Sequence, residues 1–263
     1  MEKGNPAGAD LHLVERGSGQ PLLLVHGFPL DHTMWAGQLQ DLAGHARILA
    51  PDLRGFGRSA ASGETVSMEQ FADDLAALLD ARGIHEPVVF CGLSMGGYIG
   101  WQFFRRHRSR LRGLILCDTR AVADPPAAAE ARLVNAERVL AEGMGFLADG
   151  MLDKLFAAET RQRQPDLIEA TRRVMLAASP QGVAAALRGM AARLDVSAWL
   201  PQIDVPALLL CGREDAISTV EEMRGIAHCM PQARFVEVAA AGHMSPLEQP
   251  RLVNEAIREF LDR

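Results

Sequence analysis

The sequence feature that most constrains this fold is the short stretch 87–98, PVVFCGLSMGGY. Five apolar residues lead into Gly92, and a helical pattern begins directly behind Gly96. This order predicts a buried strand, a sharp turn and a helix, with Ser94 at the tip of the turn. Such a turn strains the serine backbone, and bulky side chains at the flanking glycine positions would collide with the strand and the helix. The serine hydroxyl is therefore expected to stand clear of the sheet and face the free N–H groups of the new helix.

Strand-like and helix-like segments alternate along most of the chain. Short apolar runs predict strands, and apolar residues at helical spacing predict helices. The predicted strands cover residues 10–16, 21–25, 46–50, 87–91, 111–117, 205–211 and 234–238, and the predicted helices cover 33–42, 67–82, 95–104, 218–229 and 250–261. This alternation predicts an α/β fold, in which helices flank both faces of a mostly parallel central sheet.

One long segment interrupts the alternation. Residues 121–199 are rich in Ala, Leu, Arg and Met and contain no convincing strand pattern. Because a loop of this length is uncommon, we expect several amphipathic helices inserted between two strands. The sequence thus predicts a core domain formed by residues 1–120 and 200–263, and a helical cap domain formed by residues 121–199 over the strand ends.

Composition limits the partners and the compartment of the protein. A net charge of −6 and a pI near 5.8 argue against nucleic acid as a partner. No window is apolar enough to span a bilayer, and residues 1–10 lack the apolar core of a signal peptide. The scattered cysteines are expected to be buried, reduced thiols; they are Cys91, Cys117, Cys211 and Cys229. We therefore expect a cytoplasmic monomer or homodimer that binds neither nucleic acid nor membranes.

Ser94 needs partners to act as a nucleophile. A serine hydroxyl reacts poorly at neutral pH unless a base removes its proton and a carboxylate orients that base. Asp215 and His243 each come directly after a predicted strand, where the loops of a parallel sheet converge on one crevice. Asp118 follows the preceding strand and is the competing acid. The glycine turn before Asp215 favours Asp215, and Asp118 is expected to help start the cap.

Two backbone N–H groups are expected to stabilise a developing oxyanion. One belongs to Met95, directly after the serine, and the other to Phe28, in the loop after strand 21–25. His26 is expected to pin that loop. Residues 55–60, GFGRSA, loosely fit a dinucleotide-binding pattern, but the next helix is delayed, which argues against it. The sequence lacks metal-binding spacings, so neither a cofactor nor a metal is expected.

The chain resembles the α/β-hydrolase superfamily over nearly its whole length. The motifs that carry the resemblance are HGFP at 26–29, DLRGFGRS at 52–59, GLSMGG at 92–97, GRED at 212–215 and AGH at 241–243. In that superfamily nucleophile, acid and histidine follow one another in this order. The segments CDT at 117–119 and SPQG at 179–182, continuing to Asp195, are similar to small carboxylesterases and 3-oxoadipate enol-lactonases. Too few residues precede Asp10 for the usual first strand of these hydrolases, so the sheet is expected to lack one edge strand.

The resemblance implies a carboxylesterase that forms an acyl-enzyme on Ser94, with His243 as the base and Asp215 as the orienting acid. Esters of small to medium apolar acids are the expected substrates. The alternatives are an enol-lactone hydrolase, a C–C bond hydrolase and, in a different class, a non-catalytic small-ligand receptor on the same fold. Haloalkane dehalogenases and most epoxide hydrolases of this fold carry aspartate at the strand–helix turn, called the nucleophile elbow, where this chain has Ser94. The serine therefore argues against both activities.

The substrate pocket is expected between the strand ends and the cap. Trp35, Arg120, Met144 and Phe146 are the residues predicted to line it, beside Phe28 and Met95. Only a minority of the apolar cap residues should face this crevice; the candidates are Met144, Phe146, Met151, Leu155, Phe156, Met175 and Met190. An enol-lactone substrate would also require an arginine for its free carboxylate, for which Arg120 is the first candidate and Arg188 the second.

Overall fold

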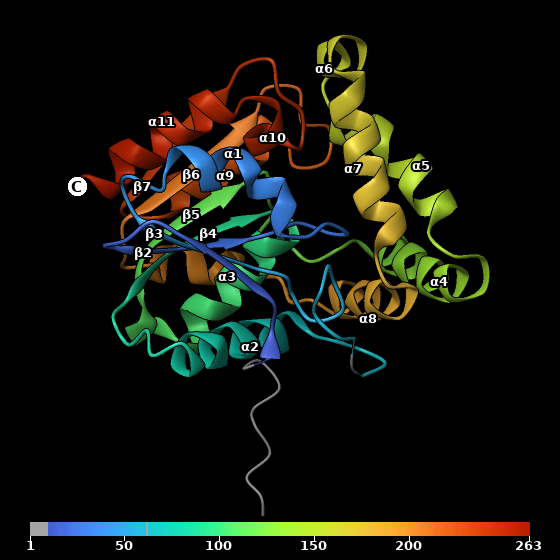
Figure 1. Ribbon diagram of the computed structural model, residues 1–263, viewed down its shortest axis with the longest axis horizontal. Helices are drawn as coiled ribbons and strands as arrows, with labels where there is room; N and C mark the ends of the chain where they lie inside the picture. The colour runs from blue at the N-terminus through green and yellow to red at the C-terminus, as the bar shows by residue number, and fades with distance from the viewer. Residues whose placement is uncertain (1–9, 62) are drawn as a thin grey trace, which may run out of the picture.

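A twisted, mostly parallel β-sheet organises the computed structural model, which describes residues 10–61 and 63–263 (Figure 1). Within those residues the sheet has seven strands in the order β1-β3-β2-β4-β5-β6-β7. The strands are β1 Leu13–Arg16, β2 Pro21–Val25, β3 Arg47–Pro51, β4 Val88–Leu93, β5 Leu111–Cys117, β6 Ala207–Gly212 and β7 Ala233–Val238. All residues of β2, β4 and β6 are buried, because helices cover both sheet faces. The predicted strands and the α/β-hydrolase fold are confirmed.

One edge of the sheet is formed by β1, which pairs antiparallel with β3, whereas the other neighbouring strands run parallel. The strand order reverses beside β2, between β3 and β4. A crevice therefore opens at the carboxyl ends of β2 and β4, where ligands bind in such sheets. The expected absence of a first strand concerns residues before Asp10, which lie outside the described residues.

Helices form a layer on each face of the sheet. One layer packs α1 (Ala36–Asp41) and α11 (Pro250–Leu261) onto one face. The other contains α2 (Met68–Ala81), α3 (Met95–Arg106) and α9 (Val220–Cys229). The shorter elements are η2 His32–Trp35, η3 Arg108–Arg110, η4 Ser197–Gln202 and α10 Ser245–Glu248. The predicted N-cap of α2 is confirmed, since the Ser67 side chain accepts the N–H of Gln70 at 3.2 Å.

Helices also occupy the segment between β5 and β6, as its composition predicted. They are α4 Pro126–Glu142, α5 Gly145–Leu155, α6 Ala158–Arg163, α7 Pro165–Ala177 and α8 Pro180–Ala191. They lie beside the strand ends, at the right of Figure 1. The treatment of this segment as a separate cap domain remains a prediction.

The glycine-rich loop after β3 packs against α8. An added Cβ at Gly182 of α8 would overlap the backbone of Gly55, and an added Cβ at Gly189 would overlap that of Val66. The N–H of Val66 also donates to the carbonyl of Ala185 at 3.1 Å. Gly55, Gly182 and Gly189 therefore permit close backbone approach between the segment after β3 and α8, whereas Gly57 leaves room for the Asp52 side chain.

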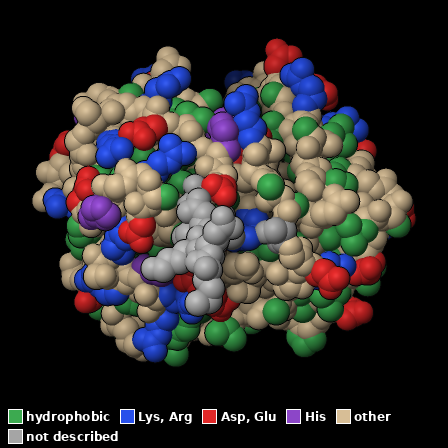
Figure 2. Space-filling view, turned by 60° about the horizontal axis from the view of Figure 1, so that its bottom comes forward, with side chains coloured by type: hydrophobic (Ala, Val, Ile, Leu, Met, Phe, Trp, Pro, Cys, Tyr) green, Lys and Arg blue, Asp and Glu red, His purple; other side chains and the backbone are tan. Residues whose placement is uncertain are grey.

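The cysteine prediction was partly wrong. Cys91, Cys117 and Cys211 are buried in β4, β5 and β6, but Cys229 is exposed, because it ends α9 where the helix leaves the sheet. Within the described residues, no helix combines the length and apolarity needed to cross a membrane. Acidic and basic side chains are intermingled on the face shown in Figure 2.

Candidate active site

The turn between β4 and α3 has the strained geometry that its glycines predicted. Ser94 adopts φ 52° and ψ −110°, in the region that favours glycine. An added Cβ at Gly92 would overlap the backbone of Gly96, and one at Gly96 would overlap that of Val25. Two hydrogen bonds hold the turn: the Ser94 N–H donates to the Cys117 carbonyl at 2.9 Å, and the Thr119 hydroxyl donates to the Ser94 carbonyl at 2.7 Å. The sequence placed Thr119 in the CDT segment but did not indicate this contact, because its partner is 25 residues away along the chain.

The structure brings Ser94, His243 and Asp215 together. His243 Nε2 lies 2.9 Å from Ser94 Oγ, and His243 Nδ1 lies 2.8 Å from Asp215 Oδ2. The other carboxylate oxygen of Asp215 accepts the N–H groups of Ile217 and Ser218 at 2.7 and 3.0 Å. Asp215 and His243 are 6% and 3% exposed, so water scarcely competes for these bonds. Since each residue follows a different strand, this contact depends on the parallel sheet.

Asp118, the competing acid, lies behind this arrangement. Its carboxylate accepts the Gly212 N–H at 2.8 Å and the Ser245 hydroxyl at 2.5 Å. Burial, and then the negative charge of Asp215, raise the pKa of Asp118 well above its ordinary range. Asp118 thus supports the end of β6 and the start of α10, which differs from its expected role in starting the cap.

The two N–H groups expected at an oxyanion site are free to donate. Neither the Phe28 nor the Met95 N–H has an acceptor among residues 10–61 and 63–263. His26 pins the Phe28 loop as predicted: its Nε2 accepts the Leu53 N–H at 3.0 Å, and its Nδ1 lies 2.9 Å from the Gly27 carbonyl. Burial lowers the pKa of His26, which favours the neutral ring that this pair of bonds requires.

A crevice of about 340 Å³ reaches from Ser94 and His243 to the inserted helices. Its wall is mainly apolar. The lining residues beyond Ser94 and His243 are Phe28, Tyr98, Ala128, Ala131, Arg132, Asn135, Leu147, Met151, Lys154, Leu155, Leu187, Met190 and Ile217. Met151, Leu155 and Met190 were among the expected candidates. Sequence reasoning missed Tyr98, one turn of α3 after the serine, and missed Leu147, which shares the α5 face of Met151 and Leu155.

The four residues first predicted to line the pocket lie elsewhere. Trp35 is fully buried in η2, which packs between α10 and the strands β2 and β3. Arg120 pairs with Glu222 of α9 at 2.7 Å, away from the crevice. Met144 is buried at the start of α5, and Phe146 lies under the Arg138 guanidinium, 3.8 Å from the ring centroid. The α5 face formed by Leu147, Met151 and Leu155 points into the crevice. Helical periodicity turns Phe146 away from it, whereas Met144 precedes α5 and packs in the core.

Arg188 also lies away from the crevice. Its guanidinium donates hydrogen bonds to the Glu64 carbonyl and to the Glu137 carboxylate, each at 2.7 Å. The cations that line the crevice are Arg132 and Lys154. Arg132 pairs with buried Asp124 at 2.5 Å, whereas Lys154 has no hydrogen-bond or ion-pair partner in the described part of the chain. Burial opposes ionisation of Asp124, but hydrogen bonds from Arg193 and Arg132 hold its pKa below the ordinary value. Lys154 therefore supplies an uncompensated positive charge.

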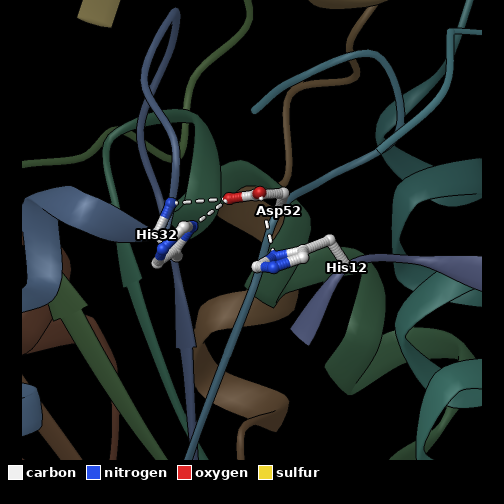
Figure 3. A group of neighbouring side chains, drawn as sticks. All are labelled: His12, His32 and Asp52. Atoms are coloured by element: carbon white, nitrogen blue, oxygen red, sulfur yellow. Dashed lines mark hydrogen bonds and ion pairs between the residues drawn. The ribbon is translucent and has the colours of Figure 1, made fainter. Parts of the chain in front are cut away.

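A group of possible metal ligands formed by His12, His32 and Asp52 lies outside the crevice (Figure 3). His12 Nδ1 and His32 Nδ1 are 3.2 and 2.6 Å from the carboxylate oxygens of Asp52. Asp52 is fully buried, and its oxygens also accept the N–H groups of His32 and Arg58 at 2.9 Å each. The Arg58 guanidinium lies 3.4 Å from His12 Nε2, and its positive charge opposes a bound cation. This chemistry fits a carboxylate that organises the loops after β2 and β3.

On a mostly parallel sheet, a serine at the strand–helix turn forms a hydrogen bond to a histidine, and a buried aspartate holds that histidine. This arrangement defines the class of α/β hydrolases. Residues 20–250 match the alpha/beta hydrolase fold family, and the chain belongs to this family of hydrolases.

Similarity to individual proteins extends over most of the chain. A thermophilic esterase from Thermogutta terrifontis is 49% identical, with a TM-score of 0.95 over 96% of this chain and 93% of that one. The enol-lactonase from Burkholderia xenovorans is 32% identical, with a TM-score of 0.90 and 96% coverage of both chains. The 3-oxoadipate enol-lactonase 2 of Acinetobacter baylyi is 27% identical over 92% of this chain and 88% of its own length.

Proposed function

We propose that this hydrolase is a carboxylesterase that cleaves small to medium esters through an acyl-enzyme on Ser94. The observation that carries the proposal is the continuous hydrogen-bonded series from Ser94 Oγ through His243 to Asp215 at the floor of the crevice. The similar esterase from Thermogutta terrifontis supports the same class of reaction. The proposed setting is the cytoplasm, where a monomer or homodimer acts on a small molecule.

The proposed reaction has two halves. His243 Nε2 takes the hydroxyl proton as Ser94 Oγ attacks the ester carbonyl, and the oxyanion accepts the N–H groups of Phe28 and Met95. The tetrahedral intermediate then collapses, and the alcohol leaves with the proton from His243. Water attacks the acyl-enzyme with His243 again as the base, and this step releases the acid and restores Ser94. Asp215 holds the His243 Nδ1–H throughout and stabilises the imidazolium.

The dimensions of the crevice favour compact acyl groups. A mainly apolar space of about 340 Å³ accommodates a short or medium acyl chain and excludes most of a long one. Across p-nitrophenyl esters of increasing acyl length, we expect kcat/KM to peak at short to medium chains and to fall for long ones. A fluorophosphonate should label Ser94 alone, as detected by peptide mass spectrometry. Labelling of another serine, or a maximum at long chains, would contradict the proposal.

A second candidate is the hydrolysis of lactones that bear a carboxylate. Lys154 supports it, because an unpaired ammonium on the crevice wall suits an anionic substrate group. Enol-lactonases from Burkholderia xenovorans and Acinetobacter baylyi are among the similar proteins. In addition, the Thermogutta terrifontis esterase structure is described as malate bound, and malate is a dicarboxylate.

Lys154→Gln tests this second candidate. Because a hydrogen bond to a charged group contributes roughly 1.5–3 kcal/mol, kcat/KM for a carboxylate-bearing enol-lactone should fall about 10- to 100-fold. Hydrolysis of a neutral lactone of the same size should remain near the wild-type rate. Arg161→Gln, which removes an equal charge from a surface pair with Asp153, is the matched control and should leave both rates unchanged. Equal rates on both lactones, unaffected by Lys154→Gln, would leave the general carboxylesterase.

A further inference from the structure

Glu248 is a buried carboxylate to which the proposed reaction assigns no role. It ends the short helix α10 and is 3% exposed. One carboxylate oxygen, Oε1, accepts the N–H of Gly242 at 2.8 Å, and the other, Oε2, accepts the N–H of Ala157 at 2.9 Å. Gly242 directly precedes His243, and Ala157 lies in the connection between α5 and α6. A single side chain thus joins the histidine loop to the inserted helices.

The segment that Glu248 holds is continuous with one wall of the crevice. Leu155, which ends α5 and lines the crevice, is two residues before Ala157. An added Cβ at Gly242 would lie 2.7 Å from the Ala157 nitrogen and 3.0 Å from the Leu155 carbonyl oxygen. The backbone of residues 155–157 therefore contacts Gly242 directly. A shift of this backbone would also displace Gly242, which precedes His243.

We propose that Glu248 is a positioning residue that fixes His243 relative to the α5 wall of the substrate crevice. This inference rests on the proposed esterase function, because it concerns the same site. Through Gly242, Glu248 sets the place of the His243 ring opposite Ser94. Through Ala157, it sets the distance between that ring and the lining residues Met151 and Leu155.

A carboxylate is required for this role because two N–H donors approach from different segments. Ionised glutamate offers an acceptor oxygen to each donor, whereas the amide of glutamine offers one oxygen and turns an NH2 group toward the other N–H. Burial raises the pKa of Glu248, while hydrogen bonds, including those from Thr160, Ala157 and Gly242, act in the opposite direction. The site therefore compensates a costly buried charge with donors from both sides.

Glu248→Gln is the test, and Thr171→Val is the matched control. Thr171 is 5% exposed on α7 and bonds only its own helix, through the Leu167 carbonyl at 2.9 Å, among the described contacts. For Glu248→Gln, kcat should fall about 10- to 100-fold on every ester, the scale of loss that a small misplacement of a catalytic group produces. KM should rise only for acyl chains long enough to reach α5. Thr171→Val should leave both constants near wild type.

Two further measurements test the positioning role of Glu248 without relying on enzyme activity. Amide hydrogen exchange should show that Gly242 and Ala157 lose protection together in Glu248→Gln, while amides within α5 keep theirs. The low-field NMR signal of the His243 Nδ1 proton should shift or broaden in Glu248→Gln and remain unchanged in Thr171→Val. Wild-type protection and an unchanged His243 signal would overturn the role of Glu248, whatever the activity. A wild-type protein that hydrolyses no ester, yet shows these changes, would overturn the esterase proposal alone.

Discussion

Ser94→Ala is expected to lower kcat for p-nitrophenyl esters by about four to six orders of magnitude. Alanine cannot form the acyl-enzyme, so only background hydrolysis aided by the oxyanion donors and by substrate binding remains. The measurement compares steady-state rates of the purified variant and wild type, and fluorophosphonate labelling should be lost in parallel.

The fold of Ser94→Ala should be unaffected. Alanine at 94 retains the backbone N–H bond to Cys117 and the carbonyl bond from Thr119, and it occupies the same positive φ as serine. The thermal midpoint should therefore remain close to that of wild type, which makes the unfolding temperature the control. Near-normal turnover in the variant would overturn the assignment of Ser94 as nucleophile and would favour another nucleophile or a contaminating esterase. A wild-type protein that binds small ligands but turns over no ester would favour the receptor alternative.

Asp215→Asn should lower kcat by about four orders of magnitude with little change in structure. The amide oxygen can still accept the N–H groups of Ile217 and Ser218, so its NH2 group must face His243 Nδ1. That nitrogen must then accept, which places the proton on Nε2, where the ring can no longer take the Ser94 proton. Steady-state kinetics and the loss of the low-field Nδ1 proton signal would both report this change of tautomer.

Asp118→Asn is the matched comparison, and its effect on kcat should be less than about tenfold. An asparagine can accept the Gly212 N–H through its oxygen and turn its NH2 group toward Ser245 Oγ, because the Ser245 hydroxyl can rotate and accept in place of donating. If this substitution abolished activity while Asp215→Asn did not, the orienting acid would lie after β5 and the assignment of Asp215 would be wrong.

The same variant gives a pH-dependent stability result. Because the pKa of Asp118 is raised in the folded protein, the folded state binds its proton more tightly than the unfolded state. In the wild type, Asp118 therefore lowers the free energy of unfolding as the pH rises above the unfolded-state pKa of this residue. Asparagine does not titrate, so the variant lacks this loss of stability. The thermal midpoint of Asp118→Asn relative to wild type should increase between acid and neutral pH. A constant difference across that range would show that Asp118 is ionised in the folded protein.

The elements and the chemistry of the elbow could be predicted from sequence because they depend on local interactions. Apolar runs and helical periodicity determine strands and helices within a few turns of chain. The glycines at 92 and 96 could be interpreted because a side chain there would overlap backbone only a few residues away, or on the adjacent strand. Asp215 and His243 could be selected because parallel strands bring their carboxyl ends to one edge.

The pocket could not be predicted in this way, because its lining depends on how α4, α5 and α8 are rotated and seated over the strand ends. A rotation of less than half a turn decides whether Phe146 or Leu147 faces the crevice, and the sequence is compatible with either. Trp35 and Arg120 were plausible by position, but Trp35 packs in the core beside α10 and Arg120 pairs with Glu222, which directs both away from the crevice.

The sequence did not indicate what some contributors to the site do. Thr119 and Glu248 act on backbone groups of segments distant along the chain, and only the folded structure brings those segments within hydrogen-bond reach. Sequence alone therefore determined the fold and the reactive triad candidates, since short-range sterics and strand order fix them. Tertiary packing alone decided the shape and charge of the crevice, because these arise from contacts between segments whose relative placement no local pattern encodes.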